Sequence, residues 1–206
     1  MTQWDTPAEA LASASSATLH EAAGRRGALP SVIGPAFAGA RLAGPAFPVA
    51  SPPGDNLWIH RAVYAAEPGD VLVVDVGGGT EFGYWGEILS TAALARGLAG
   101  LVISGGVRDR DALADLGLPV FATGLCIRGT GKDFDAVGSL GERVRIGEVF
   151  IERGDLVVGD ADGVVVIPRA DAEAVVKAGA ERDAKEAALM RRIRAGERTL
   201  DLYGWQ

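Results

Sequence analysis

Three charged residues in the middle of the chain have the types and the spacing of a catalytic site. Glu87 follows Tyr84-Trp85-Gly86, and Arg108-Asp109 comes after twenty intervening residues. That interval is about the length of one helix plus one short strand, so both charged groups can emerge at the same edge of a sheet. We therefore expect two carboxylates and one guanidinium to converge on a single pocket.

The segment between these charges supports the placement. Apolar residues recur with a helical period from Ile88 to Leu98, and residues 100–104 are an apolar run that ends in glycines, which is typical of a buried strand. Glu87 would then lie in the first turn of a helix, where free N–H groups bind a small carboxylate or phosphate. Arg108 offers a cation to the same anion, and Asp109 a hard oxygen ligand. A helix-capping Glu87 beside a surface Arg-Asp pair is an equally good interpretation of these residues alone.

The motif resembles that of a known family. Metal-dependent class II pyruvate aldolases that act on 4-hydroxy-4-methyl-2-oxoglutarate and 4-carboxy-4-hydroxy-2-oxoadipate carry an acidic residue, twenty residues and then Arg-Asp. They belong to the wider family of the regulator of ribonuclease activity A. Glu87, Arg108 and Asp109 fill this motif here. The usual first residue is Asp, so Glu87 is a departure, which moves the carboxylate by roughly 1.5 Å, about one bond length.

The resemblance covers almost the whole chain. Residues 18–27 are similar to the N-terminal segment of the aldolases, residues 69–75 to their central strand, and residues 128–132 to the loop after the Arg-Asp pair. The tail that contains Lys185-Glu186 is also similar, and shorter regulator-type relatives lack it, which favours an enzyme. The resemblance implies an α/β, layered β/β/α (swivelling-domain-like) fold with peripheral helices at both ends, assembled as a homotrimer or a homohexamer.

A metal site is part of what the resemblance implies. The ion, Mg²⁺ or Mn²⁺, is bound directly by Asp109. Glu87 contacts it through water, and so does Glu186 from a neighbouring subunit. Hard divalent ions that retain several waters suit such a set of carboxylates.

The resemblance also implies the residues that handle the substrate. Those that bind it are Gly86, Ile88, Leu89 and Arg108, with the amides of the helix start on its carboxylate. Arg108 stabilises an enolate and Glu87 moves a proton. Lys132 is a candidate for the distal carboxylate, and Glu21 a candidate for proton transfer.

The activity expected from this resemblance is cleavage of 4-hydroxy-4-methyl-2-oxoglutarate or 4-carboxy-4-hydroxy-2-oxoadipate to pyruvate and a second 2-oxo acid. Since loss of carbon dioxide from oxaloacetate forms the same enolate, we also expect oxaloacetate decarboxylase activity. The alternative is a non-catalytic regulator that binds and inhibits an RNA-degrading enzyme.

Other kinds of site have weaker support. Residues 73–80 resemble the glycine-rich motif of S-adenosylmethionine methyltransferases, but the next strand ends in Gly105-Gly106 without an acidic residue for ribose hydroxyls. A turn toward the pocket is the better interpretation of Gly77-Gly78-Gly79. His20 and His60 lack the spacing of zinc ligands, and Ser104 lacks the context of a nucleophile elbow.

Composition agrees with a small-molecule enzyme. The 206 residues carry a net charge of −7 with scattered basic residues, which argues against a nucleic-acid surface. The lone cysteine, Cys126, excludes an intramolecular disulfide and is expected to be buried filler. We expect no membrane contact and a soluble, cytoplasmic protein, because no long apolar run or signal sequence is present. One domain, residues 1–206, has an N-terminal helical segment (1–28) and a C-terminal helix and tail (170–206).

The periodicity predicts the elements that position the charged residues. A weakly amphipathic helix is expected at residues 6–23, a short strand interrupted by turns at 40–50, and a helix capped by Asp55 or Asn56. Strands at 71–76, 100–104 and 120–123 alternate with helices. Residues 143–167 form short strands, and residues 170–195 a long charged helix whose outer face is expected to be solvated.

Overall fold

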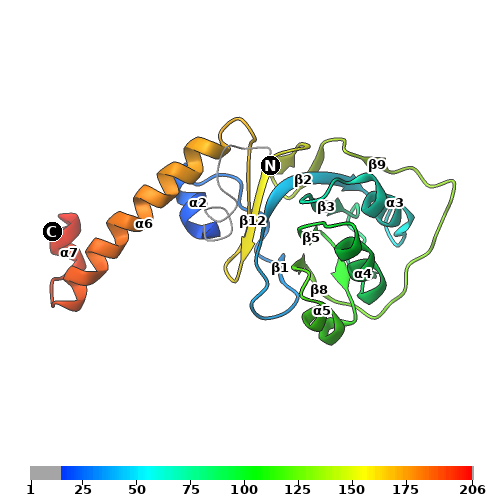
Figure 1. Ribbon diagram of the computed structural model, residues 1–206, viewed down its shortest axis with the longest axis horizontal. Helices are drawn as coiled ribbons and strands as arrows, with labels where there is room; N and C mark the ends of the chain where they lie inside the picture. Colours follow the sequence, from blue (N-terminus) through cyan, green and yellow to red (C-terminus); the bar gives the residue numbers. More distant parts are fainter. Residues whose placement is uncertain (1–14, 206) are drawn as a thin grey trace.

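The computed structural model describes residues 15–205, and a mixed eight-stranded sheet runs through the middle of this part of the chain (Figure 1). Its strands are β1 (Gly34–Pro35), β2 (Leu42–Ala50), β3 (Val71–Asp75), β5 (Gly100–Ile103), β7 (Val120–Ala122), β9 (Ser139–Leu140), β12 (Leu156–Asp160) and β13 (Gly163–Ile167). They lie in the order β1-β7-β5-β3-β2-β12-β13, with β9 beside β2. The predicted strands at 71–76, 100–104 and 120–123 are confirmed.

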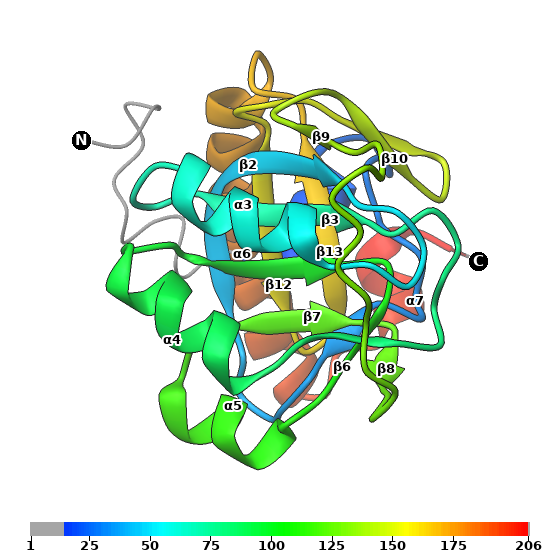
Figure 2. The ribbon, with the colours of Figure 1, turned by 90° about the vertical axis from the view of Figure 1, so that its right-hand side faces the viewer.

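Helices cover one face of the parallel strands. Strands β2, β3, β5 and β7 pair in parallel, and β3 and β5 are buried along nearly their whole length. Figure 2 shows α3 (Leu57–Ala65), α4 (Glu87–Ala95) and α5 (Arg110–Leu116) in front of this sheet. Apolar residues from both layers form one core. Burial on both faces explains why these strands are almost continuous runs of Val, Leu and Ile.

A second layer of strands covers the other face. The hairpin of β10 (Val144–Ile146) and β11 (Val149–Ile151) packs against β2 and β3, and its apolar residues share a core with Phe121 of β7. Helices, central sheet and hairpin therefore form three layers. The α/β, layered β/β/α fold predicted for the chain is confirmed.

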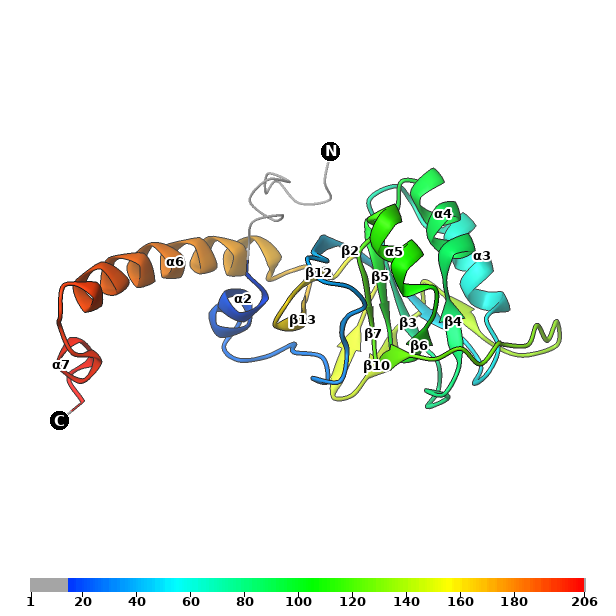
Figure 3. The same cartoon turned by 90° about the horizontal axis from the view of Figure 1, so that it is seen from below.

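A third core joins a helix near the start of the described chain to the beginning of a helix near its end. Helix α2 (Ser16–Ala22) and the start of α6 (Ala172–Arg194) pack on the β12–β13 hairpin through Leu19, Val175 and Val176. Gly179 lets α2 approach α6, because a Cβ there would lie 3.1 Å from Leu19. Beyond this contact α6 leaves the body and leads to α7 (Thr199–Tyr203), as Figures 1 and 3 show.

Two predicted elements differ from the structure. Residues 40–50 were expected to form a short, interrupted strand, but β2 is continuous from Leu42 to Ala50. The prolines fit because β2 changes partners, from β12 at residues 42–45 to β3 at residues 46–50. The Pro48 carbonyl accepts from the Gly141 N–H and therefore faces away from β3. An N–H at position 48 would face the same way, so the proline removes no hydrogen bond to β3. The helix predicted at 6–23 is observed from Ser16 to Ala22, and residues 6–14 lie outside the described part.

Within residues 15–205, no helix combines the length and the apolar character that crossing a membrane requires.

Asp160 ties α2 to the sheet through a buried carboxylate. The carboxylate accepts hydrogen bonds from the Ser16 N–H at 2.9 Å, the Ser16 hydroxyl at 2.6 Å and the Asp162 N–H at 3.1 Å. Burial alone would raise the pKa of Asp160. The hydrogen bonds from Ser16 and Asp162 and the charge of Arg41 outweigh burial and hold this pKa below its usual value.

We predict that Asp160→Asn lowers the free energy of unfolding by about 1–3 kcal/mol at pH 7, because an amide cannot accept both Ser16 donors. Since the folded pKa is lowered, the charged carboxylate stabilises the protein above the unfolded pKa, near 4, and that contribution is lost as pH falls through the folded pKa. Urea unfolding at pH 7 and pH 3 measures this difference. The exposed Asp115→Asn is the control. A loss of stability that does not change with pH would contradict the assignment.

Candidate functional site

The predicted site residues follow two adjacent strands of a small parallel sheet. This sheet has the order β4 (Gly83–Trp85), β6 (Gly106–Val107) and β8 (Gly124–Leu125). Glu87 begins α4 just after β4, and Arg108-Asp109 follows β6. The Arg108 N–H donates to the Trp85 carbonyl at 2.9 Å, which holds the two segments together. The structure therefore brings Glu87, Arg108 and Asp109 to one edge.

Asp109 turns its carboxylate toward the start of α4. Its backbone is left-handed, with φ 59° and ψ 39°, a conformation that Asp tolerates better than most residues. Although Asp109 precedes α5, its side chain makes no capping bond to that helix. Its Oδ2 instead accepts a hydrogen bond from the Glu87 N–H at 3.1 Å. Asp109 thus precedes α5 but bonds to the first residue of α4. A residue that served only to cap α5 would not need this bond.

Glycines in and after β4 make room for the side chains that follow β6. A Cβ on Gly86 would lie 2.3 Å from Asp109 Oδ2 and 3.2 Å from Arg108 Cγ. At Gly83 a Cβ would lie 2.2 Å from the Cys126 carbonyl oxygen and 3.4 Å from Arg108. The stem of Arg108 consequently runs along the glycines of β4, and the placement of Asp109 depends on the bare backbone at Gly86.

Both charged groups remain open to a ligand. Arg108 Nε lies 3.8 Å from Asp109 Oδ2, and the two side chains are 45% and 43% exposed. An exposed pair at this distance contributes little stability, so the pairing leaves both charges available to a ligand. A pocket of about 470 Å³ lies beside them, and Leu125, Cys126 and Ile127 form its other wall. Cys126 was expected to be buried filler, but it is half-buried and faces this pocket.

The oxygen ligands fit a hard divalent ion. Asp109 presents an exposed carboxylate, and the exposed Glu87 lies on the adjacent helix start. Among the described residues, no group of three or more His, Cys, Asp or Glu side chains could hold a metal. An ion here would take most of its ligands from water and substrate. That is how Mg²⁺ binds, whereas a structural zinc site needs four protein ligands.

Lys132 lies on the other side of β4. Its Nζ donates to Asn56 Oδ1 at 2.9 Å, and Asn56 Nδ2 donates to the Tyr84 carbonyl at 2.8 Å. The Lys132 ammonium also affects His60. Burial is the main cause that lowers the pKa of His60, and the positive charge of Lys132 lowers this pKa further, whereas the negative charge of Asp55 raises it. Lys132 therefore approaches the site strand through Asn56.

Glu21 and Glu186 lie elsewhere in the single chain. Both pair with Arg182, Glu21 at 3.8 Å and Glu186 at 2.8 Å, and Glu21 also pairs with Arg25 at 3.2 Å. They belong to α2 and α6, on the side of the central sheet away from α4 and α5 (Figure 3). One chain alone does not bring either residue to Asp109.

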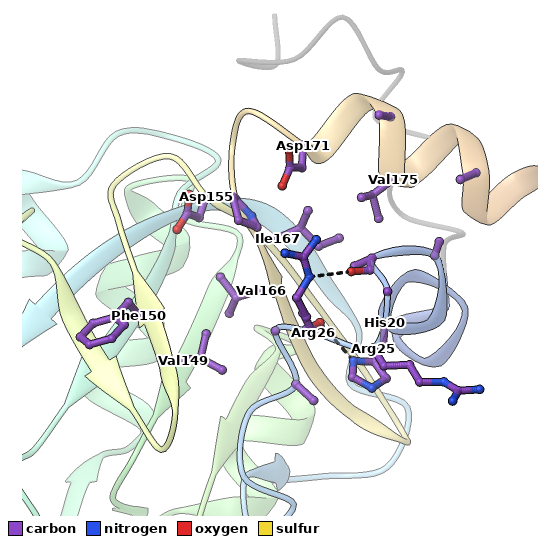
Figure 4. A pocket seen from close by; sticks show the side chains of 18 of the residues that line it. His20, Arg25, Arg26, Val149, Phe150, Asp155, Val166, Ile167, Asp171 and Val175 are labelled. Atoms are coloured by element: carbon purple, nitrogen blue, oxygen red, sulfur yellow. Dashed lines mark hydrogen bonds between the residues drawn. The ribbon is translucent and has the colours of Figure 1, made fainter.

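A larger pocket of about 990 Å³ lies between α2, the β10–β11 hairpin and α6 (Figure 4). Three of its polar side chains hold the local backbone. His20 Nδ1 bonds the Arg26 carbonyl, Arg26 Nε donates to the Ala23 carbonyl, and the Asp155 carboxylate accepts two backbone N–H groups. These three side chains are occupied by backbone groups, whereas the charges of Arg108 and Asp109 are exposed at the smaller pocket, so we place the chemistry there.

Two contributors to the site were not predicted. Tyr84 is buried, and its hydroxyl donates to the Gly79 carbonyl at 2.6 Å and accepts from the Gly54 N–H at 2.7 Å. This explains the glycine run as a turn packed on β4. Asn56 had been considered only as a helix cap, yet the N–H of Leu57 bonds Asp55 instead. Glycines flanking aromatic residues in a strand are a signal of close backbone approach that could have located Tyr84.

We predict that Lys132→Met raises the pKa of His60, because the ammonium lowers it in the wild type. An NMR titration measures this directly, since the chain has two histidines and His20 on α2 provides a reference signal. The exposed Lys177→Met on α6 is the matched control. An unchanged His60 titration in Lys132→Met would show that the ammonium does not lie beside this ring.

Comparisons with known proteins agree with the fold and the motif. The model of the RraA-like family, described as aldolase/RraA, matches residues 10–166. A protein of Halalkalibacterium halodurans, provisionally named a 4-hydroxy-4-methyl-2-oxoglutarate aldolase, is 37% identical over 165 residues, which are 80% of this chain and 78% of that protein.

Two solved structures extend the comparison to inhibitors of RNA processing. RraAS2 of Streptomyces coelicolor, described as an unusual member of the RNase ES inhibitor RraA protein family, has a TM-score of 0.77 and 28% identity, covering 91% of this chain and 98% of its own. The RNA-processing inhibitor RraA of Thermus thermophilis has a TM-score of 0.68 and 26% identity, covering 75% and 93%. Because the family model spans most of the sequence, the chain belongs to the RraA-like family.

Proposed function

We propose that the protein is a divalent-metal-dependent aldolase that cleaves 4-hydroxy-4-methyl-2-oxoglutarate, 4-carboxy-4-hydroxy-2-oxoadipate or both to pyruvate and a second 2-oxo acid. The observation that carries this proposal is the Asp109 carboxylate, held by the Glu87 N–H at a helix start and flanked by the Arg108 guanidinium. An open carboxylate beside an open cation suits a 2-oxo acid bound with a metal. Aldolase names among the relatives support it.

The reaction needs a base, an anion site and a proton donor. A base removes the proton of the C4 hydroxyl, the C3–C4 bond breaks, and its electron pair forms the enolate of pyruvate. A proton delivered to C3 then gives pyruvate. Bound Mg²⁺ or Mn²⁺ would supply Lewis-acid stabilisation of the developing negative charge.

The chain supplies the remaining roles. Arg108 is proposed to stabilise the enolate oxygen, since its guanidinium is exposed at the pocket. The amides of Ile88 and Leu89 are proposed to hold the substrate carboxylate, because the Glu87 amide is already bonded to Asp109. The exposed Glu87 carboxylate is proposed to carry the proton at the C4 hydroxyl. Lys132 is proposed to face the distal carboxylate.

A coupled assay of pyruvate release tests this function. Both aldol substrates and oxaloacetate are supplied with Mg²⁺, with Mn²⁺ and with a chelator. We expect chelator-sensitive turnover of at least one aldol substrate, and of oxaloacetate because it yields the same enolate. No turnover of any of the three with either metal would contradict the proposal.

The second candidate is an inhibitor of an RNA-degrading enzyme. It is favoured by the likeness to RraAS2, which covers 91% of this chain. At that coverage the match includes part of α6. Inhibition of RNA cleavage by a preparation without aldolase activity would support this candidate.

Asp109→Asn should reduce aldolase turnover by more than about a hundredfold. Loss of a residue that only hydrogen-bonds a metal ligand usually costs roughly ten- to a hundredfold in activity, so a larger loss points to the ligand itself. The amide keeps an acceptor for the Glu87 N–H and tolerates the left-handed backbone, so the fold should persist. Steady-state kinetics, Mn²⁺ titration and circular dichroism provide the measurements. The control is Asp111→Asn, an exposed carboxylate in the first turn of α5. Activity within a few-fold of wild type would reject Asp109 as the metal ligand.

We further propose that copies of the chain assemble as a trimer or hexamer and that Glu186 completes the metal site of a neighbour through water. The supporting observation is the outer part of α6 with α7, which projects from the body (Figure 1). It exposes 46% of Met190, 48% of Tyr203 and 62% of Trp205. Large apolar side chains on a projecting arm favour a partner surface, and Glu186 is 41% exposed on the same helix.

Mixing subunits tests this arrangement. Asp109→Asn and Glu186→Ala proteins should each be inactive, and mixed oligomers should regain part of the activity at interfaces that combine an intact Asp109 with an intact Glu186. The measurement is turnover after co-refolding, with mass spectrometry to verify mixed oligomers. Glu173→Ala, which removes an exposed carboxylate in the first turn of α6, is a control for the helix itself. Verified mixed oligomers without recovered activity would contradict a shared site.

A further inference from the structure

The pocket beside Asp109 contains a charged residue that the proposed reaction leaves without a role. Three charged residues line this pocket, Arg108, Asp109 and Arg110. Arg108 is proposed to stabilise the enolate and Asp109 to bind the metal, so both are already in use. Arg110 lines the same pocket and is exposed. A substrate in this pocket therefore meets a second guanidinium.

Arg110 has no partner that would use its charge. Within residues 15–205, its side chain forms no ion pair and no hydrogen bond. A residue on a helix faces those three and four positions further along, which here are Leu113 and Ala114. Asp111 follows directly, but adjacent residues on a helix do not face each other. The positive charge of Arg110 is therefore uncompensated.

Helix stability does not account for this arginine either. Arg110 is the first residue of α5. The start of a helix carries a partial positive charge, so a cation there is unfavourable and an anion such as Asp111 is favourable. A charge that neither pairs with a neighbour nor stabilises its helix, and that lies at a pocket, is available to an anionic ligand.

The two proposed substrates differ in one anionic group. 4-Carboxy-4-hydroxy-2-oxoadipate has a carboxymethyl group on C4, where 4-hydroxy-4-methyl-2-oxoglutarate has a methyl group. The wall of the pocket opposite the charged residues includes Leu125 and Ile127, which are 55% and 93% exposed and cannot hydrogen-bond a carboxylate. A further carboxylate in this pocket is therefore better accommodated on the side of Arg110.

We propose that Arg110 determines substrate specificity by binding the carboxymethyl carboxylate, which makes the tricarboxylate the preferred substrate. The inference rests on the proposed aldolase function. It goes beyond that function because it chooses between the two aldol substrates and names the residue that causes the preference. An arginine suits this role, since its planar guanidinium can give a carboxylate two parallel hydrogen bonds.

The test compares kcat/KM for the two aldol substrates, which are identical apart from the group on C4. The wild-type protein should prefer the tricarboxylate. Arg110→Met should lower this preference about ten- to thirtyfold, in the lower part of the range for hydrogen bonds to charged groups because the pocket is open to solvent. The loss should appear mainly in KM for the tricarboxylate, since the carboxymethyl group takes no part in the bond cleavage.

Two further measurements identify a charge-assisted contact. Arg110→Lys should keep part of the preference, because an ammonium retains the charge but loses the paired donors. Raising the salt concentration should weaken the preference of the wild-type protein and have little effect on that of Arg110→Met. Arg96→Met is the matched control, since Arg96 is an exposed arginine at the end of α4 and does not line the pocket. It should leave the preference unchanged.

Arg110→Met should fold normally, because methionine is a good helix former and a cation at a helix start is not stabilising. Circular dichroism and size-exclusion chromatography compare its fold and its assembly with those of the wild type. We expect no difference in either. A changed oligomeric state together with equal losses on both substrates would overturn the inference, because Arg110 would then serve a contact between copies.

The remaining outcomes separate this inference from the proposed function. No turnover of either aldol substrate by the wild-type protein overturns both. Turnover without a preference for the tricarboxylate overturns the inference alone. A preference that Arg110→Met leaves unchanged also overturns it, because another group would then bind the carboxymethyl carboxylate.

Discussion

The candidate site depends on the close approach of the chain after β4 to the chain after β6. At Gly86 there is no Cβ, and the Asp109 carboxylate occupies that space while it accepts the Glu87 N–H. The left-handed turn at Asp109 and the bond from the Arg108 N–H to the Trp85 carbonyl keep the two segments in register. An open carboxylate, an open guanidinium and a helix start meet only because the backbone at Gly86 is bare.

Much of this arrangement is predictable because it follows from local patterns. Apolar runs such as 71–75 and 100–103 become parallel strands buried on both faces, and the helical period after Glu87 places that residue at the start of α4. A helix and a strand between Glu87 and Arg108 return the chain to the same edge. The spacing of the motif was therefore sufficient to bring these side chains together, although it could not show which hydrogen bonds they make.

The remaining features depend on contacts between distant segments. Strands β6 and β8 have two residues each, too few to carry a periodic signal. Asn56 bonds partners that are 28 and 76 residues away, so its type suggested only a local cap. The prolines of β2 led to the prediction of an interrupted strand. They are accommodated because β2 exchanges β12 for β3 at residue 46, and this exchange depends on the whole sheet. Glu21 and Glu186 share Arg182 in one chain, and their relation to Asp109 requires a second copy.

The central claim is that the bare backbone at Gly86 lets the Asp109 carboxylate occupy its place in the site. The most direct test compares Gly86→Ala with Gly129→Ala, and it measures Mn²⁺ affinity and aldolase kcat/KM for both variants. Both glycines lie near Arg108, but only a Cβ on Gly86 would overlap Asp109 Oδ2. The nearest atom to a Cβ on Gly129 would be Arg108 Nη1, at 4.0 Å. The backbone at Gly86 is extended, so alanine adds volume without backbone strain. The account predicts that Gly86→Ala stays folded and loses Mn²⁺ binding and turnover, while Gly129→Ala keeps both. Wild-type Mn²⁺ affinity and turnover in Gly86→Ala would contradict it.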